Sequence, residues 1–216
     1  MIKNTFLYFI AVVLLSSCFK EDTSAPVITL SGNNDFTVII GSEYTEPGFT
    51  ARDNKDGDIS YLVKVTDYPN TDLSGVYYVR YNVSDASGNQ AKEITRIVYV
   101  SHNNVSLSNI YSAIGSCELS NVNNENYFIS VEKEDQDKKT LYFKGFNNLP
   151  QENKITGTIV NKTGEIITIP SQTIQDTVYS GSGTINNTGS EIVLKIIKQS
   201  NTFKDSCNTN LVRDLR

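Results

Sequence analysis

The chain has 216 residues, and its 24 Asp and Glu outnumber its 19 Lys and Arg, which gives a formal net charge of -5. This acidic balance argues against a nucleic-acid partner, because proteins that bind nucleic acids usually carry a basic face. The only histidine, His102, leaves little scope for nucleophile–base catalysis or for a histidine-based metal centre.

The first 17 residues are typical of a secretory signal peptide. Lys3 precedes an apolar run, 6–15, which is shorter than the roughly 20 residues that a helix needs to cross a bilayer. The run ends in Leu15-Ser16-Ser17-Cys18, which resembles the lipobox of bacterial lipoproteins. That resemblance implies cleavage before Cys18 and the attachment of palmitate-type acyl chains there, and several such chains anchor a protein where one does not. The alternative is an ordinary signal peptide followed by an unrelated cysteine.

The segment 18–24 is then a lipidated, charged tether. Its residues Lys20, Glu21 and Asp22 resemble the lysine-plus-two-acids export tag of Bacteroidetes surface lipoproteins. The resemblance implies a protein of the outer membrane that is anchored by lipid and faces the cell exterior. The alternative is that these three residues belong to a soluble linker without a sorting role.

Beyond residue 20 the sequence favours strands over helices. Short runs rich in Val, Ile, Thr and Tyr, such as 27–30, 36–40 and 94–100, are separated by turns rich in Gly, Asn and Asp. Between 77 and 83, apolar and polar side chains alternate, which is the period of a strand with one buried face and one exposed face. We therefore predict an all-β protein, with a β-sandwich over 25–101 and an antiparallel, barrel-like meander over 105–216.

The predicted sandwich carries several blocks of one known pattern. They are PVITLSG, IGSEYTEPGFTARDNKDGDIS, SGVYYVRYNVSDASGNQA and RIVYV. Together they resemble the Ig-like repeat of bacterial surface proteins, over about 75 residues. The resemblance implies an Ig-like β-sandwich that serves as a spacer or an adhesive module and has no catalytic activity.

Asp53, Asp56 and Asp58 form an acidic cluster that suggests calcium, which takes six to eight oxygen ligands. The stretch DNKDGDISYLVK does not fit an EF-hand loop, because Lys55 stands where an acid belongs and the twelfth residue is Lys64. The alternative interpretation is a tight turn at Asp56-Gly57, in which the acids accept hydrogen bonds from backbone amides.

The predicted second domain, 105–216, consists of successive strand-like runs with short turns. The runs are 127–131, 141–146, 155–160, 166–169, 178–185, 192–197 and 208–212. The stretch from 164 to 207 resembles the C-terminal β domains of Bacteroidetes surface lipoproteins, some of which are lipocalin-like or calycin-like. Lipocalins carry a Gly-x-Trp motif near the first strand, and this chain contains no tryptophan.

Cys117 and Cys207 are the two cysteines left after Cys18, and they lie near the two ends of the predicted meander. A secreted protein works in an oxidising compartment, so we expect them to form a disulfide that places the first and last strands side by side. The alternative is a pair of buried thiols.

For function, we expect a non-catalytic surface lipoprotein that binds glycans in a polysaccharide uptake system. The alternative is a structural or adhesive envelope component that binds other proteins. Tyr142, Phe143 and Phe146 are candidates for an exposed aromatic ligand platform, although such side chains can equally pack in the core. The acids of the second domain gather in one charged hairpin, 132–139, as in a solvated turn, so we expect neither an enzyme nor a cofactor.

Overall fold

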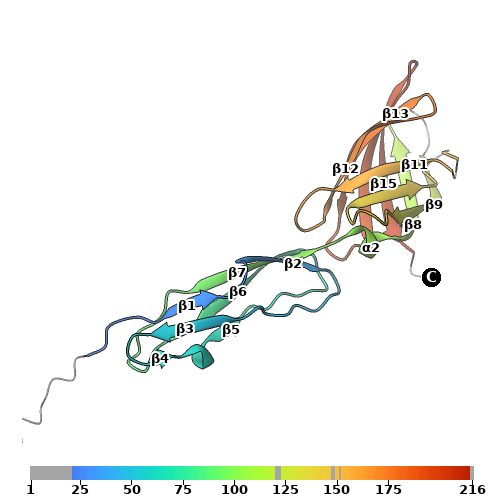
Figure 1. The fold of residues 1–216 in the computed structure, drawn as a ribbon. Coiled ribbons are helices and arrows are strands. Elements are labelled where there is room, and N and C mark those ends of the chain that lie inside the picture. The colour runs from blue at the N-terminus through green and yellow to red at the C-terminus, as the bar shows by residue number, and fades with distance from the viewer. Residues whose placement is uncertain (1–20, 120–122, 147–148, 151, 215–216) are drawn as a thin grey trace, which may run out of the picture. The chain divides into compact units, whose positions relative to one another are not determined.

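The computed structural model describes residues 21–119, 123–146, 149–150 and 152–214, and strands dominate it (Figure 1). The predicted signal peptide, Cys18 and Lys20 lie outside the described residues. The all-β class predicted from the sequence is confirmed. Across the described ranges, no helix combines the length and apolarity needed to cross a bilayer.

Contacts divide the chain into two compact units that do not follow chain order. Among the described residues, one unit comprises 21–31, 48–65 and 81–94, and the other comprises 32–47, 66–80 and 95–214. The domain limits 25–101 and 105–216 therefore stay a prediction.

The first unit contains a small sheet in the order β1-β3-β4. Its strands are β1 (Val27–Leu30), β3 (Phe49–Asp53) and β4 (Gly57–Asp58). The 3-10 helix η1 (Ser60–Leu62) and the strand β5 (Lys64–Thr66), which belongs to another sheet, follow β4 in the chain. β1 and β3 pair antiparallel and bury Ile28 and Ala51 on one face, as the strand period requires. Gly57 adopts a φ of 74° in the β3–β4 turn, a conformation that glycine reaches without steric cost.

A second sheet, most of whose residues belong to the second unit, has the order β2-β7-β6-β5. Its longer members are β2 (Asp35–Ile39), β6 (Gly75–Asn82) and β7 (Ile94–Ser101), and β2 runs parallel to β7. The alternation predicted along β6 is confirmed, because Val79 and Tyr81 are fully buried while Tyr78 is half exposed. The sequence of this strand alone therefore predicts which of its faces is buried and which is exposed.

Eight further strands form a closed antiparallel barrel (Figure 1). They are β8 (Asn109–Cys117), β9 (Asn123–Lys133), β10 (Thr140–Lys144), β11 (Lys154–Ile159), β12 (Ile166–Ile174), β13 (Thr177–Ile185), β14 (Glu191–Gln199) and β15 (Lys204–Arg213). Each strand pairs with the next one along the chain, and β15 pairs with β8 to close the circle. The predicted meander is confirmed, and its first strand, β8, is one that the sequence analysis did not identify.

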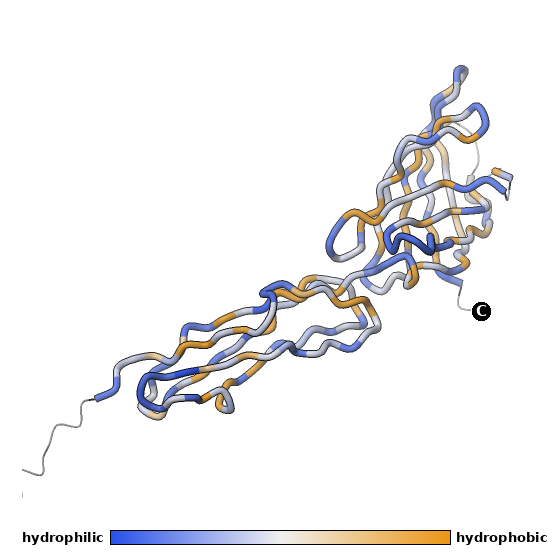
Figure 2. The backbone as a smooth tube through the Cα atoms, in the orientation of Figure 1, coloured by the Kyte–Doolittle hydropathy of each residue, from blue (hydrophilic) through white to orange (hydrophobic). Residues whose placement is uncertain are grey.

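The barrel interior is filled by apolar side chains from all eight strands. The largest fully buried members are Tyr111, Phe143, Phe146, Leu141, Ile129, Ile155, Ile167, Ile169 and Ile192. In Figure 2, hydrophobic and hydrophilic stretches alternate along the barrel chain, and hydrophilic colour gathers at several hairpin tips. An eight-stranded barrel either fills with side chains or holds one small ligand, and in this barrel apolar side chains occupy the interior.

The short helix α2 (Asn104–Leu107) precedes the barrel and closes part of one end. Its N-cap, Asn103, forms a capping box with Ser106, and Leu107 is buried in the barrel core. The amide of the buried Asn104 donates hydrogen bonds to the carbonyls of Glu134 and Thr140, at 2.8 and 3.1 Å. These bonds attach α2 to the β9–β10 hairpin.

Candidate functional site

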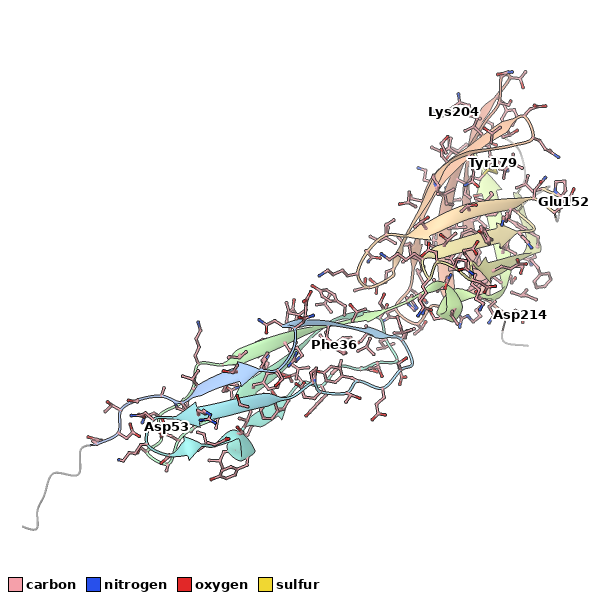
Figure 3. The ribbon with its side chains drawn as sticks, in the orientation of Figure 1. Phe36, Asp53, Glu152, Tyr179, Lys204 and Asp214 are labelled. Atoms are coloured by element: carbon pink, nitrogen blue, oxygen red, sulfur yellow. A yellow bond between two sulfur atoms is a disulfide. The ribbon has the colours of Figure 1, made fainter. Side chains whose placement is uncertain are left out.

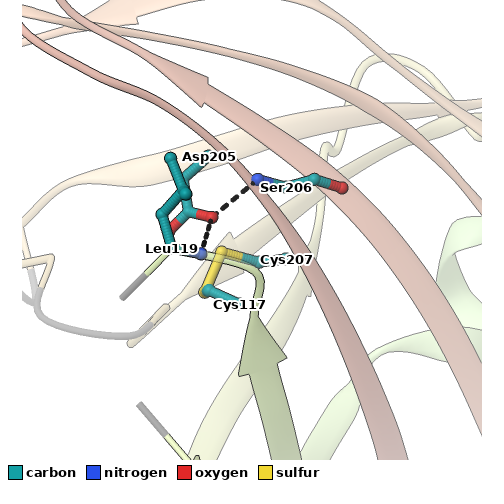
Figure 4. Close-up of a disulfide and its surroundings, with 5 residues drawn as sticks. All are labelled: Cys117, Leu119, Asp205, Ser206 and Cys207. Atoms are coloured by element: carbon teal, nitrogen blue, oxygen red, sulfur yellow. Dashed lines mark hydrogen bonds between the residues drawn. A yellow bond between two sulfur atoms is a disulfide. The ribbon is translucent and has the colours of Figure 1, made fainter. Parts of the chain in front are cut away.

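The disulfide predicted between Cys117 and Cys207 is confirmed, with an S–S distance of 2.03 Å (Figure 4). The two residues are direct cross-strand partners on β8 and β15, and their Cα atoms lie 4.0 Å apart. The bridge therefore joins the first and last strands of the barrel, as the sequence analysis expected. It covalently stabilises the pairing of β8 with β15, which closes the barrel.

A buried carboxylate, Asp205, stands beside this disulfide (Figure 4). Its Oδ1 accepts hydrogen bonds from the backbone amides of Leu119 and Ser206, both at 2.9 Å. The two nearby sulfur atoms are bonded to each other and cannot serve as thiolate ligands. The arrangement is consequently structural and holds the chain where it leaves β8.

The aromatic platform predicted from Tyr142, Phe143 and Phe146 is not present as an exposed group. Phe143 is fully buried and Phe146 is 1% exposed, so both belong to the barrel core. Strict alternation would have placed Phe146 on the face of Tyr142. However, β10 ends at Lys144, and Gly145 turns the chain at a φ of 81°, after which Phe146 enters the core.

Tyr142 alone of the three lies on the outer side of the barrel, where it is half-buried. Its hydroxyl donates a hydrogen bond to Oε2 of Glu134, and Nζ of Lys154 lies 3.3 Å from the centre of its ring. The hydrogen bond raises the pKa of Tyr142 and lowers the pKa of Glu134, because it favours the protonated phenol and the ionised carboxylate. A ligand role for Tyr142 stays a prediction, and its ring already has a cation on one face.

The three acids predicted from the β3–β4 loop have separate partners. Oδ1 of Asp53 accepts from the amides of Lys55 and Asp56, at 2.8 and 2.9 Å, and these bonds lower the pKa of Asp53. Asp58 accepts from the amide and hydroxyl of Ser60, which lowers its pKa. Oδ2 of Asp56 accepts from the amide of Ala86 at 2.7 Å. The caps expected of a tight turn are thus present, and metal binding by these acids stays a prediction.

The feature that sequence reasoning missed is an uncharged patch on part of the outer surface of three neighbouring barrel strands, β15, β8 and β9. We call it the neutral face. Its outward side chains are Asn208, Asn210 and Val212 of β15, Ser112, Ile114 and Ser116 of β8, and Asn126 and Phe128 of β9. All are exposed except the half-buried Ser112. None of the eight can ionise.

The strand register arranges the neutral face as rows across the barrel wall. One row runs from Val212 to Ser112 to Phe128, and the next from Asn210 to Ile114 to Asn126. Apolar and amide or hydroxyl side chains therefore alternate along each row. Charged residues resume on β14, where Glu191 and Lys195 pair with Val212 and Asn208. The sequence shows the alternation of each strand, and only the pairing brings these residues together.

Comparisons with known proteins identify the first part of the chain. Residues 28–100 match the family model described as bacterial surface protein, Ig-like domain. Among curated proteins, none matches this chain.

Two solved structures are similar to parts of this chain. A lipoprotein of Bacteroides thetaiotaomicron is 18% identical, with a TM-score of 0.36 and coverage of 87% of this chain and 100% of that one. An outer-membrane protein candidate from Bacteroides fragilis is 9% identical, with a TM-score of 0.31 and coverage of 88% and 95%. The chain therefore carries an Ig-like domain of the bacterial surface protein type at residues 28–100 and a closed eight-stranded barrel in its C-terminal region.

Proposed function

We propose that this protein is a non-catalytic, lipid-anchored component of the outer membrane that faces the cell exterior and binds neutral glycans through the neutral face of its barrel. The observation that carries the proposal is the uncharged grid on β15, β8 and β9. We further propose that this binding serves polysaccharide uptake.

The chemistry of the neutral face matches that of a sugar ring. Such a ring presents C–H groups on its faces and hydroxyl groups around its edge. On the neutral face, Ile114 lies between the amides of Asn210 and Asn126, and Ser112 lies between Val212 and Phe128. Apolar side chains can cover the ring faces while amides and hydroxyls, which both donate and accept, bond to its edge. The absence of charge on this grid favours a neutral ligand over an acidic one.

The packed interior supports a ligand site on the outside of the barrel. Tyr111, Phe143 and Phe146 occupy the interior positions that would line a lipocalin-type cavity. Phe128, by contrast, is 54% exposed and offers an aromatic ring to solvent on the outer wall. An extended polysaccharide can lie along the exposed outer wall of the barrel without entering the protein.

We expect Phe128→Ala to weaken glycan binding about tenfold, since loss of an aromatic contact of about 1.4 kcal/mol corresponds to that factor. Asn210→Ala should weaken it to a similar degree by removing an edge contact. The measurement is affinity electrophoresis of the full chain in detergent against a panel of neutral and acidic polysaccharides. Tyr61→Ala is the matched control, because Tyr61 is 81% exposed on η1, outside the barrel.

Two results would contradict the proposal. In the first, none of the neutral polysaccharides slows the migration of the protein. In the second, a neutral polysaccharide slows the wild type, Phe128→Ala and Asn210→Ala equally. If instead these substitutions abolish the capture of another envelope protein, the neutral face is a protein-binding surface, as in the adhesive or structural alternative.

Anchoring is proposed to depend on Cys18, with Lys20, Glu21 and Asp22 directing export to the outer face. We expect Cys18→Ala to eliminate the labelling of the protein by a fatty-acid analogue and to release it from the membrane fraction, because the acyl chains supply its attachment. Metabolic labelling followed by fractionation measures both effects. Cys117→Ala, which removes a different cysteine, serves as the control. Equal labelling of the wild type and Cys18→Ala would exclude lipidation at this residue.

A further inference from the structure

Three buried carboxylates from separate segments meet in the first unit of the structure. Asp22 precedes β1, Asp53 is the last residue of β3, and Asp85 lies in the turn that follows β6. Asp22 is 9%, Asp53 8% and Asp85 6% exposed, and each supplies an oxygen within 4.8 Å of those of the other two. Figure 3 labels Asp53 beside the β3–β4 turn. Three acids so close and so deeply buried require a compensating charge or hydrogen-bond donor.

The hydrogen bonds of the protein compensate only part of this cluster. Oδ1 of Asp22 accepts from the amide of Ser24 at 3.1 Å, and Oδ1 of Asp53 accepts from two amides of its own loop. The Oδ2 atoms of both Asp22 and Asp53 are buried and have no hydrogen-bond partner. Within the described part of the chain, no lysine or arginine forms an ion pair with Asp22, Asp53 or Asp85. Two carboxylate oxygens thus remain available for a cation.

We infer that Asp22, Asp53 and Asp85 bind one calcium ion, which attaches the N-terminal segment at Asp22 to two loops of the Ig-like domain. Calcium binds oxygens at about 2.3–2.6 Å, so two ligands on opposite sides of the ion lie about 4.8 Å apart. The spacing within the cluster fits that limit. Magnesium usually keeps several of its waters and is rarely held by a dedicated set of protein oxygens, and zinc favours nitrogen and sulfur. Backbone carbonyls and water would complete the six to eight ligands of calcium.

Neighbouring hydrogen bonds hold the three segments in place for this role. Nδ2 of Asn89 donates to Oδ2 of Asp85 at 2.7 Å and to the carbonyl of Asp22 at 2.9 Å. Oδ2 of Asp56 accepts from the amide of Ala86, which joins the β3–β4 loop to the turn that contains Asp85. Asn89 and Asp56 therefore act as positioning residues. Of the three acids that the sequence analysis grouped as a possible calcium site, only Asp53 is a ligand in this proposal, and Asp56 and Asp58 are not.

The test is a calcium titration of the full chain in detergent after chelation, by isothermal titration calorimetry and differential scanning calorimetry. We expect one calcium ion per chain, with a Kd on the order of 10⁻⁴–10⁻³ M as in extracellular modules, and a rise in melting temperature with calcium concentration. Asp22→Asn keeps the shape of the side chain and removes one charge. It should weaken calcium binding at least tenfold.

Glu21→Gln is the matched control, because Glu21 is exposed, adjacent to Asp22 and loses the same charge, and it should change the affinity less than twofold. Hydrogen exchange of the amides at 22–25 gives a second readout and should slow when calcium is added to the wild type but not to Asp22→Asn. The inference is overturned if calcium up to 10 mM, about ten times the weakest expected Kd, produces neither heat nor a melting shift. It is equally overturned if Asp22→Asn binds as the wild type does, or if magnesium binds as tightly.

Discussion

Replacing both Cys117 and Cys207 with alanine is expected to lower the free energy of unfolding of the barrel by about 4–5 kcal/mol. The disulfide spans 90 residues of chain. In the chain-entropy model, a closed loop of this length removes about 15.5 cal/mol/K from the unfolded state, which is about 4.6 kcal/mol at 25 °C. Alanine is preferred to serine because Cys207 is 1% exposed, and a buried hydroxyl would add a separate cost.

Scanning calorimetry of the full chain measures this effect, since a protein with two units can unfold in more than one transition. The barrel transition should fall by a temperature on the order of 20 °C for a domain of this size. Reduction of the wild type should give a similar fall, and reduction of the double variant should have no further effect. An unchanged barrel transition in the double variant would show that strand pairing alone maintains the closure.

Phe143→Ala is expected to destabilise the barrel by roughly 3–5 kcal/mol, the range for removing a fully buried phenylalanine. Phe143 is fully buried on β10, and its ring packs over Gly157 of β11, where an added Cβ would lie 3.0 Å from Cε2. The substitution would leave a cavity in the centre of a packed interior, because the surrounding strands belong to a closed sheet and cannot collapse into it freely. Chemical denaturation of the full chain measures the loss.

Tyr142→Ala is the control for this experiment because it changes the adjacent residue on the outer side of the same strand. It removes a surface hydrogen bond to Glu134 and the contact with Lys154, so we expect a much smaller loss of stability than Phe143→Ala causes. Gly157→Ala should destabilise the wild type, because the added Cβ would lie 2.9 Å from Cγ2 of Ile167 and 3.0 Å from Cε2 of Phe143, and Phe143→Leu should relieve only the second of these contacts. Equal effects of Phe143→Ala and Tyr142→Ala would contradict the assignment of inner and outer faces.

The sequence by itself determined the all-β class, the Ig-like region and the pairing of Cys117 with Cys207. These features depend on short stretches of sequence or on the number of cysteines available for pairing. The alternation along β6 follows from the two-residue period of a strand, and the turn at Asp56-Gly57 follows from the positive φ that glycine adopts. The disulfide followed from there being one pair of cysteines left in an oxidising compartment.

The tertiary structure decided which residues meet across strands. Alternation alone could not show that Gly145 turns Phe146 into the core, and it could not identify β8, whose outward residues form the neutral face only through pairing with β9 and β15. The same holds for Asp22, Asp53 and Asp85, which are separated by more than 30 residues from each other in sequence and meet in one cluster. The physical reason is that hydrogen-bond register and barrel closure are set by the packing of the whole sheet, and a one-residue change of register would send every side chain of a strand to the opposite face.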